Sequence, residues 1–111
     1  MEMKAALSAL AALSQESRLA VFRHLVAAGP VGAAAGQIGA KLKLPLSTLS
    51  FHLKELKIAG LVVSRRDGRS LIYAANFPAM TRLIAYLTEN CCAGSACAPA
   101  GSTLNRKGAT S

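Results

Sequence analysis

Three cysteines stand close together near the end of this 111-residue chain. Cys91 and Cys92 are adjacent, and Cys97 follows after four small residues, 93–96. Thiolates are soft ligands that select thiophilic ions, and a trivalent arsenic or antimony centre prefers three sulfurs. Structural zinc normally takes four ligands, and the neighbouring sequence offers no fourth side chain. The cysteine spacing therefore favours a three-thiol site for a thiophilic metalloid.

Other interpretations of the same cysteines remain open. One alternative is that they are incidental residues of the tail, and another is that they form a thiol redox switch. Adjacent cysteines form only a strained disulfide, so such a switch would pair Cys97 with Cys91 or Cys92. A small thiol reductase is less consistent with the sequence, because the spacing is not C-x-x-C and no strand–helix phosphate loop is present. A Cys/His nucleophile pair stays open, although His24 and His52 lie far away along the chain. We expect a protein that is not an enzyme, with no catalytic residue.

Positive charge is concentrated in the middle of the chain. The formal net charge is +8, and residues 41–69 contribute +5 of it, with seven basic side chains against Glu55 and Asp67. An excess of this size favours a polyanionic partner, either nucleic acid or an acidic membrane surface. The simpler explanation is a solvated charged face. The motifs around these residues decide in favour of nucleic acid.

Apolar periodicity and turn residues predict a mainly α fold with a small β-hairpin (α+β). The strongest hairpin signal is Asp67-Gly68 between two β-rich runs. Two helix N-caps are expected, Ser14 for the second helix and Asn76 for the last. The final helix has an apolar face at Met80, Leu83, Ile84 and Leu87, and the first has a leucine stripe at Leu7, Leu10 and Leu13. The predicted helices cover residues 3–13, 14–28, 33–42, 47–59 and 76 onward, and the predicted strands cover residues 61–66 and 69–74.

The order of these elements is helix, turn, helix, wing, which suits double-stranded DNA. On the helix predicted at 47–59, Leu49, Leu53 and Leu56 share one face, and polar residues lie opposite. Phe51 either contacts a thymine methyl group or packs against a neighbouring helix or the wing. His52 lies toward the core edge, where a structural role or a phosphate contact is expected. The predicted DNA-binding residues are Ser47, Thr48, Ser50, Phe51, His52, Lys54, Arg65, Arg66 and Arg69.

The chain resembles the ArsR/SmtB family of metal-responsive repressors over residues 5–92. The resemblance rests on the runs LSQESRL at 13–19, LSTLSFHLKEL at 46–56, AGLV at 59–62 and RRDGR at 65–69, and on Tyr73. It implies a winged helix-turn-helix homodimer in which the first and last helices form the interface. It also implies release from operator DNA when a metal or metalloid binds.

The sequence departs from the best-known ligand positions of that family. Residues 33–38 contain no cysteine, and residues 80–90 contain neither His nor Asp. Instead, Cys91, Cys92 and Cys97 resemble the cysteine trio that a minority of arsenic repressors carry after the last helix. We therefore expect trivalent arsenic, or antimony, as the inducer and no organic cofactor. A redox-sensing repressor and a ligand-independent DNA-binding protein are the alternatives.

The expected organisation is one DNA-binding and dimerisation domain at residues 1–92, a metalloid-binding segment at 91–97 and a disordered tail at 98–111. The N-terminal apolar run lacks a cleavage-site pattern, and residues 24–40 contain too many glycines and a proline for a membrane span. The expected location is the cytoplasm. The expected partners are operator DNA and a second copy of the chain.

Overall fold

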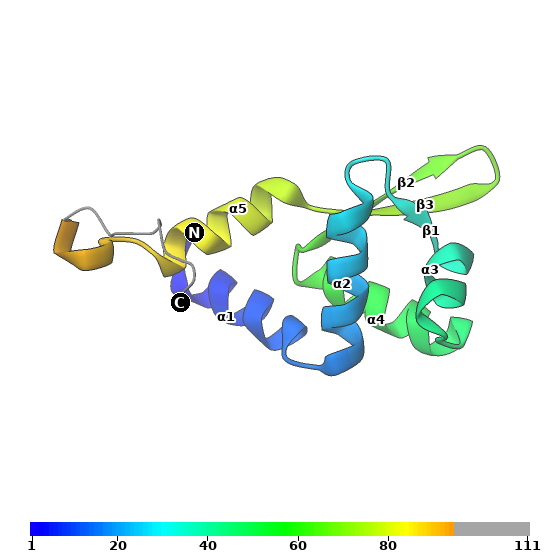
Figure 1. Cartoon of the computed structure of the whole chain (residues 1–111), viewed down its shortest axis with the longest axis horizontal. Helices are drawn as coiled ribbons and strands as arrows, with labels where there is room; N and C mark the ends of the chain where they lie inside the picture. The colour runs from blue at the N-terminus through cyan, green and yellow to red at the C-terminus, as the bar shows by residue number, and fades with distance from the viewer. Residues whose placement is uncertain (95–111) are drawn as a thin grey trace, which may run out of the picture.

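The computed structural model describes residues 1–94, which form a mainly helical fold with one small sheet (Figure 1). The expected α+β class is confirmed, and the order of the elements is that of a winged helix-turn-helix. The elements are α1 (Met3–Leu13), α2 (Glu16–Ala28), β1 (Ala33–Ala34), α3 (Ala35–Leu42), α4 (Leu46–Ile58), β2 (Val62–Asp67), β3 (Ser70–Ala75), α5 (Phe77–Leu87) and the short turn η1 (Cys91–Gly94). The predicted tail at 98–111 and Cys97 lie outside the described residues.

Helix α1 packs through alanines rather than leucines. Ala6, Ala9 and Ala12 are buried at every third position, and their small side chains let α1 approach its neighbours closely. Leu7 and Leu10 of the predicted leucine stripe are exposed. The apolar surface of α1 is therefore larger than the part that this single chain covers.

The junction between α1 and α2 differs from the sequence prediction. Ser14 ends α1, and its Oγ donates a hydrogen bond to the carbonyl of Ala11 over 2.8 Å. The N-cap of α2 is Gln15, whose side-chain oxygen accepts from the backbone N–H of Arg18. The prediction of Ser14 as N-cap was wrong, because Ser14 still ends α1 and α2 begins one residue later, with Gln15 as its cap. The predicted end of α2 at Gly29-Pro30 is confirmed.

A two-residue strand replaces the predicted start of the third helix. Ala33 pairs with Tyr73 and Ala34 with Ile72 in antiparallel register. Gly32 makes this pairing possible, because its φ is +70° and a Cβ there would lie 2.3 Å from the carbonyl oxygen of Tyr73. Only glycine fits such a close approach of two backbones.

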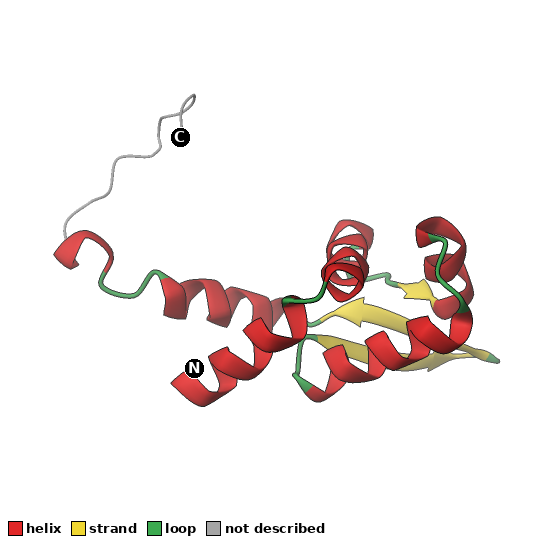
Figure 2. Ribbon diagram, turned by 90° about the horizontal axis from the view of Figure 1, so that it is seen from below, coloured by secondary structure: helices red, strands yellow, loops and turns green. Residues whose placement is uncertain are grey.

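The sheet has the order β1-β3-β2, and its long hairpin extends away from the helices (Figure 2). Asp67 pairs with Ser70 at the tip, and Val62 pairs with Ala75 at the base. Gly68 has a φ of +63° at the turn, as the Asp-Gly signal predicts. The base of the hairpin is buried, whereas its distal half is exposed.

Asn76 connects the sheet to α5. Its Oδ1 accepts from the backbone N–H of Ala79, and its Nδ2 donates to the carbonyl of Gly60. The predicted N-cap is confirmed, and the second bond attaches the start of α5 to the turn after α4. The core beneath these elements is aliphatic, with Leu25, Ile38, Leu49, Leu53, Leu56 and Leu61 among its fully buried side chains. No helix in the described part of the chain is long and apolar enough to cross a membrane.

Candidate nucleic-acid interface and thiol site

Helix α4 has two opposite faces. Leu49, Leu53 and Leu56 are buried, and this fixes the rotation of the helix about its axis. The opposite face, which we call the α4 crest, consists of Ser47, Phe51, Lys54 and Ile58, spaced by four, three and four residues. All four crest residues are exposed, as are Thr48 and Ser50 beside them. The α4 crest carries three of the predicted contact residues, and Thr48 and Ser50 beside it bring the number on this accessible surface to five.

Two hairpin arginines extend this surface. Arg66 lies near the tip of β2, and Arg69 lies in the turn between the strands. Both are exposed, and no hydrogen bond or salt bridge to either side chain is found among residues 1–94. Their guanidinium groups are available to an external anion such as a phosphate.

Arg65 is oriented differently from the other two arginines. Its Nη2 donates to the carbonyl of Val31 over 2.8 Å, and its Nη1 lies 3.4 Å from the carbonyl of Pro30. These bonds attach the hairpin to the loop that precedes β1. Arg65 was predicted as a phosphate contact, but in this structure its guanidinium is occupied by backbone oxygens and positions the hairpin.

A hollow between α4 and the hairpin was not predicted from the sequence. It measures about 410 Å³ and is lined by Ser50, Leu53, Lys54, Lys57, Ile58 and Tyr73. Lys57 Nζ donates to Ser64 Oγ over 2.7 Å, which links the end of α4 to β2. Lys57 was counted only as part of the charged segment. The sequence signal that would have placed Lys57 beside this hollow is its spacing from Lys54, which is one helical turn away on the side of the hairpin.

His52 does not share the α4 crest. Only 7% of its surface is exposed, and its Nδ1 is buried without a hydrogen-bond partner in the described structure. Burial lowers the pKa of His52 below its usual value of 6.5, and the nearby Arg18 guanidinium lowers it further. The burial of the side chain favours the structural role expected for His52 over a phosphate contact.

The thiol site begins where α5 ends. Thr88 caps α5, and the chain then turns so that Cys91 Sγ and Cys92 Sγ lie 3.6 Å apart on the surface. Cys92 has a φ of +57°. Within residues 1–94 no group of three or more His, Cys, Asp or Glu side chains comes together. The third predicted ligand, Cys97, lies outside the described residues.

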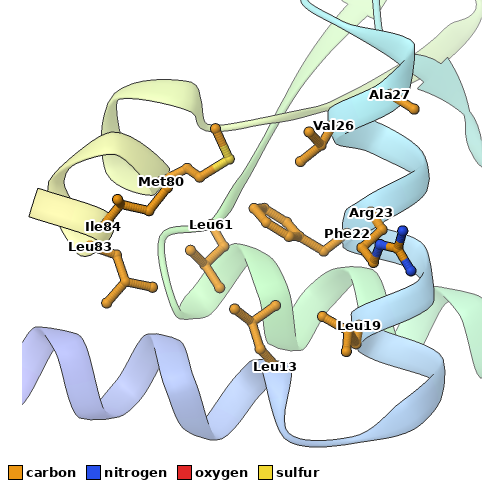
Figure 3. Close-up of a pocket in the computed structure, with 10 residues that line it drawn as sticks. All are labelled: Leu13, Leu19, Phe22, Arg23, Val26, Ala27, Leu61, Met80, Leu83 and Ile84. Carbon is orange, nitrogen blue, oxygen red and sulfur yellow. The ribbon is translucent and has the colours of Figure 1, made fainter. Parts of the chain in front are cut away.

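An apolar groove separates α1, α2 and α5 (Figure 3). Its volume is about 510 Å³, and its lining includes Leu13, Phe22, Met80, Leu83 and Ile84. The ring of Phe22 points into it, whereas Arg23 is at its margin. Leu7, Leu10 and Leu87 add exposed apolar surface on the same two terminal helices. We call the groove together with the exposed leucines of these two helices the α1/α5 face.

Comparison with known proteins agrees with this geometry. A family model described as a helix-turn-helix domain matches residues 13–65, from the end of α1 into the hairpin. An ArsR-like transcriptional regulator from Rhodococcus sp. RHA1 superposes with a TM-score of 0.68 and 27% identity, covering 76% of each chain. The chain is a winged helix-turn-helix protein that is similar in structure and sequence to ArsR-family transcriptional regulators. Its relatives are DNA-binding regulators and not enzymes.

Two further relatives show how similar proteins assemble and how much of their length this chain matches. The homodimeric winged helix-turn-helix DNA-binding domain Mb0332 from Mycobacterium bovis, described as a possible ArsR-family regulator, has a TM-score of 0.65 and 29% identity over 78% of this chain and 77% of its own. The HTH-type regulator YceK from Bacillus subtilis is 42% identical over 59 residues. That match spans 53% of this chain and 58% of the relative.

Proposed function

We propose that this chain binds operator DNA as a homodimer, with α4 in the major groove and the hairpin tip against the phosphate backbone. The observation that carries the proposal is the shared accessibility of the α4 crest and of Arg66 and Arg69. A helix fits the major groove of B-DNA, and basic residues beside it supply sequence-independent affinity. The dimer is proposed from the uncovered α1/α5 face.

Binding is tested with the purified full chain and the duplex upstream of its own gene. Retardation of this duplex, but not of a shuffled duplex of equal composition, is the expected result. Footprinting is expected to protect two half-sites separated by about 34–36 Å, which is one helical turn. Equal affinity for both duplexes at physiological salt would contradict a specific operator function.

We further propose that trivalent arsenic is the inducer and that Cys91, Cys92 and Cys97 bind it. Two thiolates bound at about 2.3 Å to one centre lie roughly 3.3 to 3.8 Å apart for bond angles of about 90° to 110°. The 3.6 Å separation of Cys91 Sγ and Cys92 Sγ falls in this range, so the two sulfurs could share one centre once both are reduced to thiolates. Antimony has the same donor preference and is the second candidate ion.

Induction is explained by the place of these cysteines. Closing a three-thiol loop directly after α5 would unwind or redirect the end of a helix that carries part of the α1/α5 face. The two recognition helices of a dimer would then change their spacing. Such a coupling typically amounts to about 1–3 kcal/mol, which weakens DNA binding about 5- to 150-fold.

The inducer is tested by titrating arsenite into the protein–operator complex. Release is expected at stoichiometric arsenite, and X-ray absorption is expected to show three sulfur neighbours. Each single Cys→Ser variant should bind the operator normally but respond weakly. If the triple Cys→Ser protein still leaves its operator when arsenite is added, the sensing site lies elsewhere.

A thiol redox switch is the second candidate function. It is favoured by Cys92, which is disulfide-bonded in this structure. Because adjacent cysteines form only a strained disulfide, the switch is proposed to pair Cys97 with Cys91 or Cys92. In this case an oxidant such as hydrogen peroxide, and not arsenite, would release the operator, and a dithiol reductant would restore binding. The two titrations on the same complex separate the candidates.

A further inference from the structure

We infer that Phe51 reads the C5-methyl group of one thymine in each half-site, so that the operator is selected at that position by an apolar contact. This inference rests on the proposed binding of DNA by α4. Within that binding mode, it gives Phe51 the role of recognising the thymine methyl group.

Phe51 is the only aromatic residue of α4, and it lies in the middle of the α4 crest. Over half of its surface, 54%, is exposed, and it is not among the side chains that pack against the core in the described structure. Its neighbours on the α4 crest are Ser47 one turn before and Lys54 one turn after. The structure therefore does not support packing against the neighbouring helix as the reason for an aromatic residue here.

The chemistry of the major groove limits what such a ring can recognise. A phenyl ring neither donates nor accepts a conventional hydrogen bond, so it cannot read the polar base edges. The apolar group that a standard base presents in the major groove is the methyl of thymine. Serine and lysine on either side of Phe51 are suited to polar base edges and phosphates. With a thymine opposite the ring, Phe51 contacts the methyl group while Ser47 and Lys54 can contact polar base edges and phosphates.

The helix that carries Phe51 is held in place before DNA arrives. The next residue, His52, is buried, and the two ring centroids are 5.8 Å apart with an interplanar angle of 59°. Leu49 and Leu53 on either side are fully buried, so the helix cannot rotate without disrupting the core. A residue on a helix that is already held in place loses less conformational entropy on binding. The effect of a single methyl contact on the affinity is then large enough to measure.

The span of the contact follows from helix and duplex dimensions. Ser47 and Lys54 lie about 6 Å and 4.5 Å from Phe51 along the helix axis, and successive bases are about 3.4 Å apart on one strand. The ring of Phe51 therefore contacts one base, and Ser47 and Lys54 lie near the bases on either side of it. Ile58, which is 70% exposed, lies about 10.5 Å further along the same crest and is a matched control for an exposed apolar side chain.

The experiment uses a duplex that the purified full chain selects from a randomised pool. Each thymine of this duplex is then replaced singly by deoxyuridine, which lacks only the methyl group. Fluorescence anisotropy at fixed salt measures the affinity of the wild type, of Phe51→Ala and of Ile58→Ala. Thermal unfolding confirms that each variant is folded, as expected for exposed positions.

The wild type should lose about fourfold in affinity at one thymine of each half-site, the value of one buried methyl group. Phe51→Ala should bind more weakly and show no deoxyuridine penalty at that position, whereas Ile58→Ala should retain the full penalty there. A wild type without any position-specific penalty, or an equal penalty in Phe51→Ala, overturns the inference about Phe51. Failure of the wild type to bind or enrich any duplex overturns the proposed DNA-binding function itself.

Discussion

Three arginines of the hairpin have the same charge but different surroundings. Arg65 donates to the carbonyls of Val31 and Pro30, whereas Arg66 and Arg69 lie exposed near the tip. A guanidinium that already satisfies backbone oxygens must give up those bonds to reach a phosphate. The three side chains are therefore expected to contribute to DNA binding in two distinct ways.

Replacing Arg66 or Arg69 by Ala should weaken binding to all duplexes alike, because phosphate contacts carry no sequence information. Each replacement should also reduce the slope of log K against log salt by about one. Arg65→Ala should leave this slope unchanged and lower the midpoint of thermal unfolding slightly. The measurement is anisotropy at several salt concentrations. An equal slope change in Arg65→Ala would mean that Arg65 leaves the loop when DNA binds.

His52 makes stability depend on pH. Its pKa is lowered in the folded chain, first by burial and then by Arg18, so the unfolded chain binds more protons as the pH falls through the usual histidine range. Its contribution to stability is present above pH 6.5 and is lost as the pH falls below that value. Thermal unfolding of the wild type should therefore occur at lower temperature at pH 5.5 than at pH 7.5.

The control for this pH dependence is the other histidine. His24→Gln should keep the decrease between pH 7.5 and pH 5.5, and His52→Gln should reduce it. His52→Gln is also expected to be less stable at pH 7.5, because the glutamine amide brings more hydrogen-bonding groups into the same buried position. A wild type whose unfolding midpoint does not change between the two pH values would argue against a neutral, buried His52.

At the scale of the element, local backbone conformation decides the start of the helix-turn-helix. Gly32 holds a φ of +70°, and a Cβ there would meet the carbonyl oxygen of Tyr73 at 2.3 Å. Gly32→Ala should destabilise the protein by about 2–3 kcal/mol through backbone strain and loss of the β1–β3 pairing. Gly36→Ala is the matched control, because nothing lies within 4 Å of its Cβ position. It should be neutral or stabilising by up to about 1 kcal/mol.

Chemical denaturation measures the free energy of unfolding of both glycine variants. Equal stability of Gly32→Ala and Gly36→Ala would show that the backbone near Tyr73 adapts without cost. Loss of the β1–β3 pairing is also expected to increase amide exchange at Ala33 and Ala34.

The sequence predicted the elements whose signals are local. Helix α4 follows from the spacing of Leu49, Leu53 and Leu56, and the start of α5 follows from Asn76. Strand β1 was missed because two alanines carry no strand signal, and its pairing with β3 is a tertiary contact. The exposure of the predicted contact residues on the α4 crest could also be predicted, because it follows from helical periodicity. The orientation of Arg65 depends on a loop that is more than thirty residues away in sequence.

At the scale of the whole molecule, the cysteine turn and the wing hairpin lie at opposite ends. Figure 1 shows α1 and α5 at one end and the hairpin at the other. The cysteine turn follows α5 directly, so the proposed induction would act on α4 through the α1/α5 face and the core. A dimer interface on that face would connect the two ends, because it sets the relative position of the two recognition helices.

The last prediction concerns this interface. Ile84 is 54% exposed, lies on α5 and lines the apolar groove. In a dimer that buries the α1/α5 face, Ile84→Lys places a charge in an apolar contact, and the cost of burying an unpaired charge should dissociate the dimer. Sedimentation at micromolar concentration should show a folded monomer, since Ile84 is not part of the core of the single chain.

Val31→Lys is the matched control, because Val31 is equally apolar and even more exposed but lies in the loop before β1. It should remain a dimer. Loss of bivalency should weaken binding of Ile84→Lys to a two-half-site duplex by about 10²- to 10⁴-fold, while its affinity for an isolated half-site should equal that of the wild type. If Ile84→Lys remains a dimer with unchanged affinity for the full site, the copies associate through another surface. The cysteine turn would then require a route to α4 that does not pass through the α1/α5 face.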